Sequence, residues 1–104
     1  MDTDGKRWTV KDRYGNFIYL TQERWEHIID PNNHPKMELY EEFIKMTIIK
    51  GKRHQEPLHH NKYRYKHRFD VLFDEDNQSI EVVVIIDFNN LDIPNNWIVT
   101  AYLV

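Results

Sequence analysis

The chain has 104 residues, a formal net charge of −3 and no cysteine, which excludes a disulfide framework, thiolate chemistry and a second large core. Its longest purely apolar run, residues 82–86, is far too short to span a membrane, so no membrane partner is expected. The first six residues are polar, which argues against a signal peptide, and the lack of cysteine fits a cytoplasmic protein.

The first predicted element is a hairpin. Residues 8–10 and 17–20 read as short strands, and the connection at 11–16 contains Gly15, which is free to adopt positive φ. Thr21 is then predicted to cap a helix that runs to about residue 30, where Pro31 ends it. Trp25, Ile28 and Ile29 would form its apolar face, and His27 lies away from that face.

A second helix is predicted over residues 36–49. Leu39, Phe43, Met46 and either Ile49 or Thr47 form an apolar stripe along it, which Tyr40 and Ile44 widen. Gly51 is predicted as the residue just past its end. Residues 54–61 contain Pro57 and are expected to be irregular.

Basic residues alternate strictly with rings in residues 62–69, whose sequence is KYRYKHRF. In a strand, successive side chains point to opposite faces, so four cations would share one face. These cations are Lys62, Arg64, Lys66 and Arg68. Their step of about 7 Å is close to the spacing of successive phosphates along an extended nucleic-acid strand. We therefore interpret this row as a surface for phosphate, although charged residues also protect sheet edges.

Positive charge is concentrated in the part of the chain that contains this row of cations. Residues 50–68 hold seven of the 14 Lys and Arg residues and a single acid, Glu56. This segment therefore carries a charge of +6 and the remainder of the chain −9. Such a two-sided molecule can steer an anion in spite of its negative net charge.

The last part of the chain predicts two further strands. A polar turn at 74–79 precedes a β-branched run at 80–88, which is typical of a central strand buried on both faces. A loop at 89–96 leads to a closing strand at 97–104. On that strand Thr100 and Tyr102 would share one face, and the other face would hold Trp97, Val99, Ala101 and Leu103.

The order of elements is therefore β-β-α-α-β-β-β over one domain, residues 1–104. We expect an α+β fold in which two N-terminal helices pack on a four- to five-stranded antiparallel sheet.

RNA cleavage without a metal needs a proton acceptor, a proton donor and a fixed cation, and histidine, arginine and lysine can supply them. His27 and His34 are the candidates for proton transfer; the alternative interpretation of His27 is a solvated surface histidine, and that of His34 is a helix cap. Thr100 and Tyr102 could orient a phosphate or simply pair across the sheet. A metal site is not expected, since the chain lacks cysteine and its histidine spacings match no compact ligand set.

Several short motifs resemble a known family. They are IYLT at 18–21, WEHI at 25–28, His34-Pro35, YRY at 63–65 and WIVTAY at 97–102. Together they are similar to the phage- and plasmid-borne nuclease domains of the barnase–EndoU–colicin–RelE (BECR) superfamily. That resemblance implies a metal-independent endoribonuclease without a cofactor. Many such domains are toxins, which implies RNA as substrate and a cognate antitoxin or immunity protein as partner.

The resemblance also implies which residues act. It points to His27, His34, Arg64, Thr100 and Tyr102 as catalytic residues, with Lys66 beside Arg64 holding phosphate. One departure is Lys36, because many relatives have glutamate after the His-Pro pair. The alternative interpretation is therefore a non-catalytic protein- or RNA-binding module with a decayed nuclease-like site.

Overall fold

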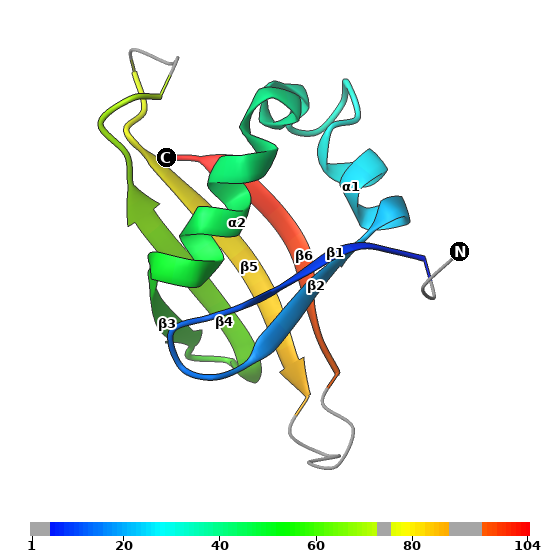
Figure 1. The fold of residues 1–104 in the computed structure, drawn as a ribbon, viewed down its shortest axis with the longest axis vertical. Coiled ribbons are helices and arrows are strands. Elements are labelled where there is room, and N and C mark those ends of the chain that lie inside the picture. The colour runs from blue at the N-terminus through cyan, green and yellow to red at the C-terminus, as the bar shows by residue number, and fades with distance from the viewer. Residues whose placement is uncertain (1–4, 73–75, 88–94) are drawn as a thin grey trace.

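Six strands form one mixed sheet in the computed structural model, which describes residues 5–72, 76–87 and 95–104 (Figure 1). The order across the sheet is β1-β2-β6-β5-β4-β3, so β1 and β3 are the edges. The strands are β1 Lys6–Lys11, β2 Phe17–Thr21, β3 Lys52–Glu56, β4 His59–Arg68, β5 Ser79–Asp87 and β6 Asn95–Leu103. The helix α1 Gln22–Ile28, the 3₁₀ helix η1 Pro35–Tyr40 and the helix α2 Glu41–Lys50 lie between β2 and β3 in the chain.

The predicted arrangement of two N-terminal helices on a four- to five-stranded antiparallel sheet is wrong, although the fold is α+β. The hairpin β1–β2 precedes the helices and belongs to the same sheet. β2 also pairs in parallel with β6, where Tyr19 lies beside Trp97, so the sheet is mixed. Hydrophobic alternation indicates which face a strand buries, but it does not indicate which distant strand lies beside it.

Strand β3 falls largely in the segment that was expected to be irregular. It pairs antiparallel with β4, from Lys52 opposite Lys66 to Glu56 opposite His59. Its sequence, KRHQE, contains no apolar residue, so it carries no hydrophobic period. An edge strand of this kind is held by backbone hydrogen bonds to its neighbour, and its charged side chains are typical of protected edges.

Both helices cover the same face of the sheet (Figure 1). α2 packs on β4 and β5, and α1 packs on β2 and β6. The predicted cap is confirmed, because the Thr21 hydroxyl accepts a hydrogen bond from the Arg24 backbone N–H at 3.0 Å. Among the described elements no helix covers the opposite face, which is therefore open to a ligand.

The apolar stripe predicted for the second helix is partly wrong. Leu39 is 70% exposed, whereas Ile48, which lies outside the predicted stripe, is fully buried; Ile44, at the margin of the predicted stripe, is buried as expected. The segment is a 3₁₀ helix up to Tyr40 and an α-helix after it. Because a 3₁₀ helix has three residues per turn, Met37 and Tyr40 lie on the same side of η1, and both are buried. Leu39 therefore points away from the side that α2 buries.

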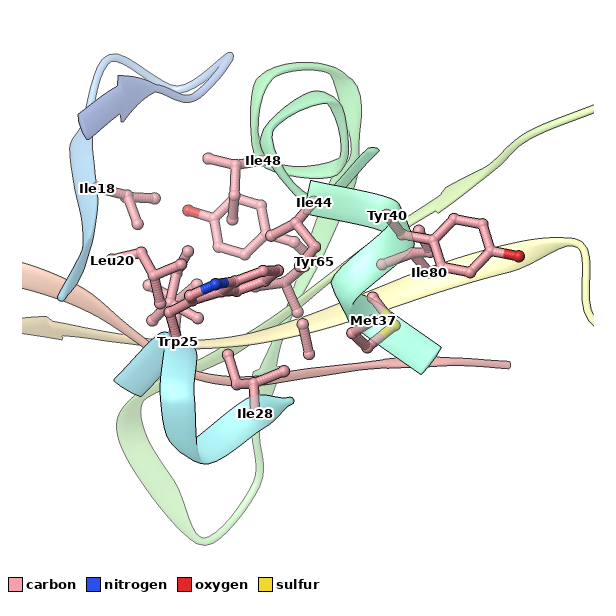
Figure 2. Packing of buried hydrophobic residues seen from close by; sticks show 14 of the residues in the cluster. Ile18, Leu20, Trp25, Ile28, Met37, Tyr40, Ile44, Ile48, Tyr65 and Ile80 are labelled. Atoms are coloured by element: carbon pink, nitrogen blue, oxygen red, sulfur yellow. The ribbon is translucent and has the colours of Figure 1, made fainter. Parts of the chain in front are cut away.

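The core lies between the helices and the sheet. Figure 2 shows the Trp25 ring of α1 pointing into the same space as Ile44 and Ile48 of α2 and Leu20 of β2. Tyr65 of β4 is fully buried in this cluster. The central position of β5 is confirmed, since it lies between β4 and β6 and five of its side chains are buried, Ile80, Val82, Val83, Val84 and Ile86.

The alternation predicted for the basic strand is confirmed. Tyr65 faces the helices with no exposed surface, while Lys66 and Arg68 are exposed on the open face. Tyr63 and Phe69 pack against the core from the same side as Tyr65. The row of cations therefore lies on the face that no described helix covers.

A β-bulge in β6 changes which side chains share the open face. Val83 pairs with Thr100, but the next residue of β5, Val84, pairs with Ile98, so Val99 is extra. Its carbonyl accepts hydrogen bonds from the Arg24 guanidinium at 2.7 and 3.1 Å. The extra residue reverses the alternation, and Trp97 shares the face of Thr100 and Tyr102, against the prediction.

The tip of the β1–β2 hairpin closes onto β3 and β4 through the buried side chain of Asp12. This carboxylate accepts hydrogen bonds from the backbone N–H groups of Tyr14 and Asn16 and from the Tyr65 hydroxyl. The Arg53 guanidinium lies 3.6 Å from it. Burial and the bond to Asp12 raise the pKa of Tyr65. The hairpin is thus joined to the opposite edge of the sheet by a polar cluster.

Gly51 ends α2, as predicted, but for a different physical reason. Its φ of −71° and ψ of 158° are open to any residue, so no left-handed conformation requires glycine. A Cβ built on it would lie 2.3 Å from the Thr47 carbonyl oxygen and 2.9 Å from the Lys66 carbonyl oxygen. Gly51 is needed because the end of α2 crosses the backbone of β4 too closely for a side chain.

The substitution Gly51→Ala is therefore expected to destabilise the domain by about 1–3 kcal/mol, as overpacked sites do. Urea unfolding followed by tryptophan fluorescence measures the difference in the free energy of unfolding. An unchanged midpoint would show that the backbone relaxes and that the close approach is not required.

The loop predicted at 89–96 falls largely outside the described residues, and the first part of the turn predicted at 74–79 also lies outside them. None of the helices in the described ranges combines the length and apolar character needed to cross a bilayer.

Candidate functional site

Arg64 is the centre of a polar cluster on the open face of the sheet. Its Nε donates to Glu56, which lies at the end of β3. Its Nη1 donates to the Tyr102 hydroxyl on β6 and lies 3.4 Å from Glu81 on β5. The side chain therefore extends from β4 across β5 to β6, and 40% of it remains exposed. Two carboxylates hold the guanidinium in one orientation and leave part of it open to a ligand.

Tyr102 connects this guanidinium to a carboxylate. Its hydroxyl accepts the hydrogen bond from Arg64 and donates one to Glu81. Burial and the bond to Glu81 raise the pKa of Tyr102 to about 12. The hydrogen bond from Arg64 to Glu56 raises the pKa of Arg64. At neutral pH the site therefore contains a fixed positive charge and a protonated phenol.

His34 approaches the cluster from the helical segment. It occupies the N-cap position of η1 without a side-chain cap bond, and its ring centroid lies 5.5 Å from that of Tyr102. The two rings line one side of a cavity of about 370 Å³. Asn33 and Asn77 contribute amide groups to this cavity, and Lys36 contributes a cation. We call this space the His34 cavity.

Thr100 lies on the same face, two strands away from Arg64. The register places Val83 between them, and Val83 is only 5% exposed although it faces away from the helices. Thr100 Oγ1 is shielded from solvent and has no hydrogen-bond partner in the described part of the chain. A buried hydroxyl without a partner is costly, and beside a fixed guanidinium it can bond to a ligand.

A second and strongly basic cavity lies on the other side of the cluster. Its volume is about 480 Å³, and none of the described residues that line it is a carboxylate. We call it the basic cavity; its lining residues are Arg13, Lys50, Lys52, His54, Lys66, His67, Arg68 and Ser79. It joins two members of the predicted cation row, Lys66 and Arg68, to cations from β3, α2 and the hairpin turn.

The four cations of the row differ in their partners. Arg64 is paired with Glu56 and Glu81. Within residues 5–72, 76–87 and 95–104, no ion pair forms at Lys62, Lys66 or Arg68. The row is therefore not neutralised by the described carboxylates, and three of its cations remain available to a polyanion.

His27 lies elsewhere. It is exposed near the end of α1 and lines a different cavity, together with Asp30, Asn32 and Asn33. No contact between described residues joins His27 to Arg64 or Tyr102. Of the two candidate histidines, the structure brings only His34 to the side chains on the sheet.

Sequence reasoning did not single out Glu81, although it contacts both Arg64 and Tyr102. The available signal was its position, because Glu81 interrupts an otherwise apolar run in β5 on the face of the strand that turns away from the core. Glu56 gave no such signal, since its contact with Arg64 depends on the pairing of β3 with β4. Among the described residues no group of three His, Asp or Glu side chains is arranged to hold a metal ion.

Comparisons with known proteins do not assign the chain to a family. No family model matches the chain, and neither the curated proteins nor the solved structures include a match. Any function assigned to the chain therefore depends on the arrangement of Arg64, Glu81, Tyr102 and His34.

Proposed function

We propose that the chain is an endoribonuclease that cleaves RNA by transesterification at the cluster of Arg64, Glu81, Tyr102 and His34. The observation that carries this proposal is the convergence of four complementary groups beside a basic surface. They are a fixed guanidinium, a carboxylate, a protonated phenol and an imidazole. Cleavage of a phosphodiester by a neighbouring hydroxyl needs a proton acceptor, a proton donor and a fixed positive charge.

In the proposed reaction Glu81 accepts the proton of the ribose 2′-hydroxyl, and the 2′-oxygen forms a bond to the adjacent phosphorus. Arg64 stabilises the negative charge that develops on the phosphoryl oxygens. The bond from phosphorus to the 5′-oxygen then breaks, and the His34 imidazolium donates a proton to that oxygen. The products are a 2′,3′-cyclic phosphate and a free 5′-hydroxyl.

Tyr102 and Thr100 orient the phosphate in this proposal. The Tyr102 hydroxyl lies between Arg64 and Glu81, so a ligand oxygen at the guanidinium is within its range. Because the pKa of Tyr102 is about 12, its hydroxyl remains a hydrogen-bond donor at every pH at which the enzyme would be assayed. The unpartnered hydroxyl of Thr100 can contribute a further bond to the same phosphate.

The substitution His34→Ala is expected to lower RNA cleavage by about 10²-fold, the usual effect of losing a proton donor or acceptor. The substrate is a labelled single-stranded RNA in EDTA, and the cyclic phosphate product is identified by mass spectrometry. Tyr102 should add no step to the pH dependence of the rate below pH 10, because its pKa is about 12.

His60→Ala is the matched control, since His60 is an exposed histidine of β4 outside the cluster. A 2′-deoxy substitution at the cleaved nucleotide should abolish the reaction. If wild type fails to cleave RNA, or if His34→Ala matches it at every pH, the proposed chemistry is wrong.

One observation favours a second candidate, a non-catalytic module that binds RNA or an acidic protein surface. Arg64 already has two carboxylate partners of its own, which weakens its attraction for a phosphate. The unpaired cations of the row would remain as a binding surface in this case. Salt-dependent RNA binding without cleavage by wild type would support this second candidate.

A further inference from the structure

The basic cavity is not used by the proposed chemistry. Two of its lining residues, Lys52 of β3 and Lys66 of β4, are directly opposite each other on the open face. Arg68 and Arg13 approach the same space from β4 and from the hairpin turn. No ion pair with a described residue forms at Lys52 or Lys66.

Such a pair is unfavourable in the empty protein. Like charges that face each other across two strands destabilise a sheet, since their Cβ atoms lie about 5 Å apart. On its other side Lys66 lies opposite Glu81, but that carboxylate is engaged by Arg64 and Tyr102 and forms no ion pair with Lys66. A bound anion between the two ammonium groups removes the repulsion, and hydrogen bonds from both sides hold it.

The position of this pair relative to Arg64 indicates the kind of anion. One row of paired residues crosses the open face from Tyr102 through Glu81 and Lys66 to Lys52. Neighbouring strands lie about 5 Å apart, so Lys52 is about 10 Å from Glu81, and Lys66 is about 7 Å from Arg64 along β4. These distances are close to the distance between neighbouring phosphates of a single strand, so the two lysines lie about one nucleotide from the proposed site of cleavage.

We propose that Lys52 and Lys66 form a second phosphate subsite, which binds the backbone phosphate next to the one that is cleaved. The ligand class is a single-stranded RNA with at least two phosphates. This inference rests on the proposed function, because only a cleaved RNA has a phosphate next to the one that reacts. With this subsite occupied, the RNA would cross the open face with the His34 cavity on one side of the reacting phosphate and the basic cavity on the other.

The first test measures cleavage of a dinucleoside monophosphate and of two longer forms of it, one with an added 5′-terminal phosphate and one with an added 3′-terminal phosphate. The added phosphate is expected to raise kcat/KM of wild type about tenfold at low salt. The double variant Lys52→Ala/Lys66→Ala should lose this gain, so that its kcat/KM is the same for the three substrates. Lys11→Ala/Lys45→Ala, which removes two cations outside the cavity, should keep the gain.

A second measurement separates this inference from the proposed function. Fluorescence anisotropy gives the affinity for a labelled, non-cleavable 2′-O-methyl trinucleotide as a function of salt. The Lys52→Ala/Lys66→Ala variant should reduce the slope of log K against log salt by about 0.7, since the subsite binds one phosphate and each neutralised phosphate of a single strand contributes about that much. The variant should also unfold at a urea concentration no lower than wild type, because it loses a repulsion.

The outcomes are distinct. If wild type cleaves all three substrates equally, or if the double variant keeps the full gain, the subsite is excluded while the nuclease stands. If wild type cleaves nothing but the salt slope falls as expected, the subsite stands as a phosphate site of a binding module. An unchanged slope together with no cleavage overturns both proposals.

Discussion

Replacing Arg64 with alanine is expected to lower RNA cleavage by about 10²-fold, since Arg64 is the fixed positive charge of the candidate site. The two carboxylates that contact it hold the guanidinium in place before a substrate binds. The loss should therefore fall on kcat more than on KM, because the charge acts on the phosphoryl oxygens as their negative charge develops. Initial rates with a labelled RNA measure both constants.

Two further variants make this result interpretable. Arg64→Ala leaves Glu56 and Glu81 without their shared cation, so its thermal unfolding must be measured beside its activity. Arg64→Lys keeps the charge but not the fork of donors, and intermediate activity is expected. Lys11→Ala removes an exposed cation of β1 and should have no effect. A folded Arg64→Ala protein with wild-type rates would remove Arg64 from the mechanism.

The largest expected effect on stability is that of Asp12→Ala, at about 3 kcal/mol. The Asp12 side chain is fully buried, and it is bonded to the Tyr65 hydroxyl and two backbone N–H groups beside Arg53. Its removal leaves these donors without their acceptor in the interior, where an unpaired polar group is costly. The hairpin tip should also separate from β3 and β4, since Asp12 connects them.

Urea unfolding compares the free energy of unfolding of Asp12→Ala with that of wild type. Asp70→Ala is the matched control, because Asp70 is an exposed aspartate, and a change below about 0.5 kcal/mol is expected there. Asp12→Asn keeps the shape of the side chain and should cost less than Asp12→Ala. A loss of less than 1 kcal/mol for Asp12→Ala would mean that the hairpin tip does not depend on this cluster.

The sequence alone determined the local features of this protein. Strict alternation in residues 62–69 placed Tyr65 in the core and the cations on the open face, because successive side chains of a strand must point to opposite sides. The β-branched run in β5 indicated a central strand, and Thr21 indicated the start of α1. Each of these depends on residues that are neighbours in the chain.

Tertiary structure alone decided the pairings between distant segments. The parallel contact of β2 with β6, the edge strand β3 and the bulge at Val99 leave no period in the sequence. The bulge places Trp97 on the face of Tyr102, and strand pairing brings Glu81 to Arg64. The contact of His34 with Tyr102 likewise joins a turn to the last strand. The candidate site is therefore visible only after folding, because its members come from four segments whose proximity no local pattern encodes.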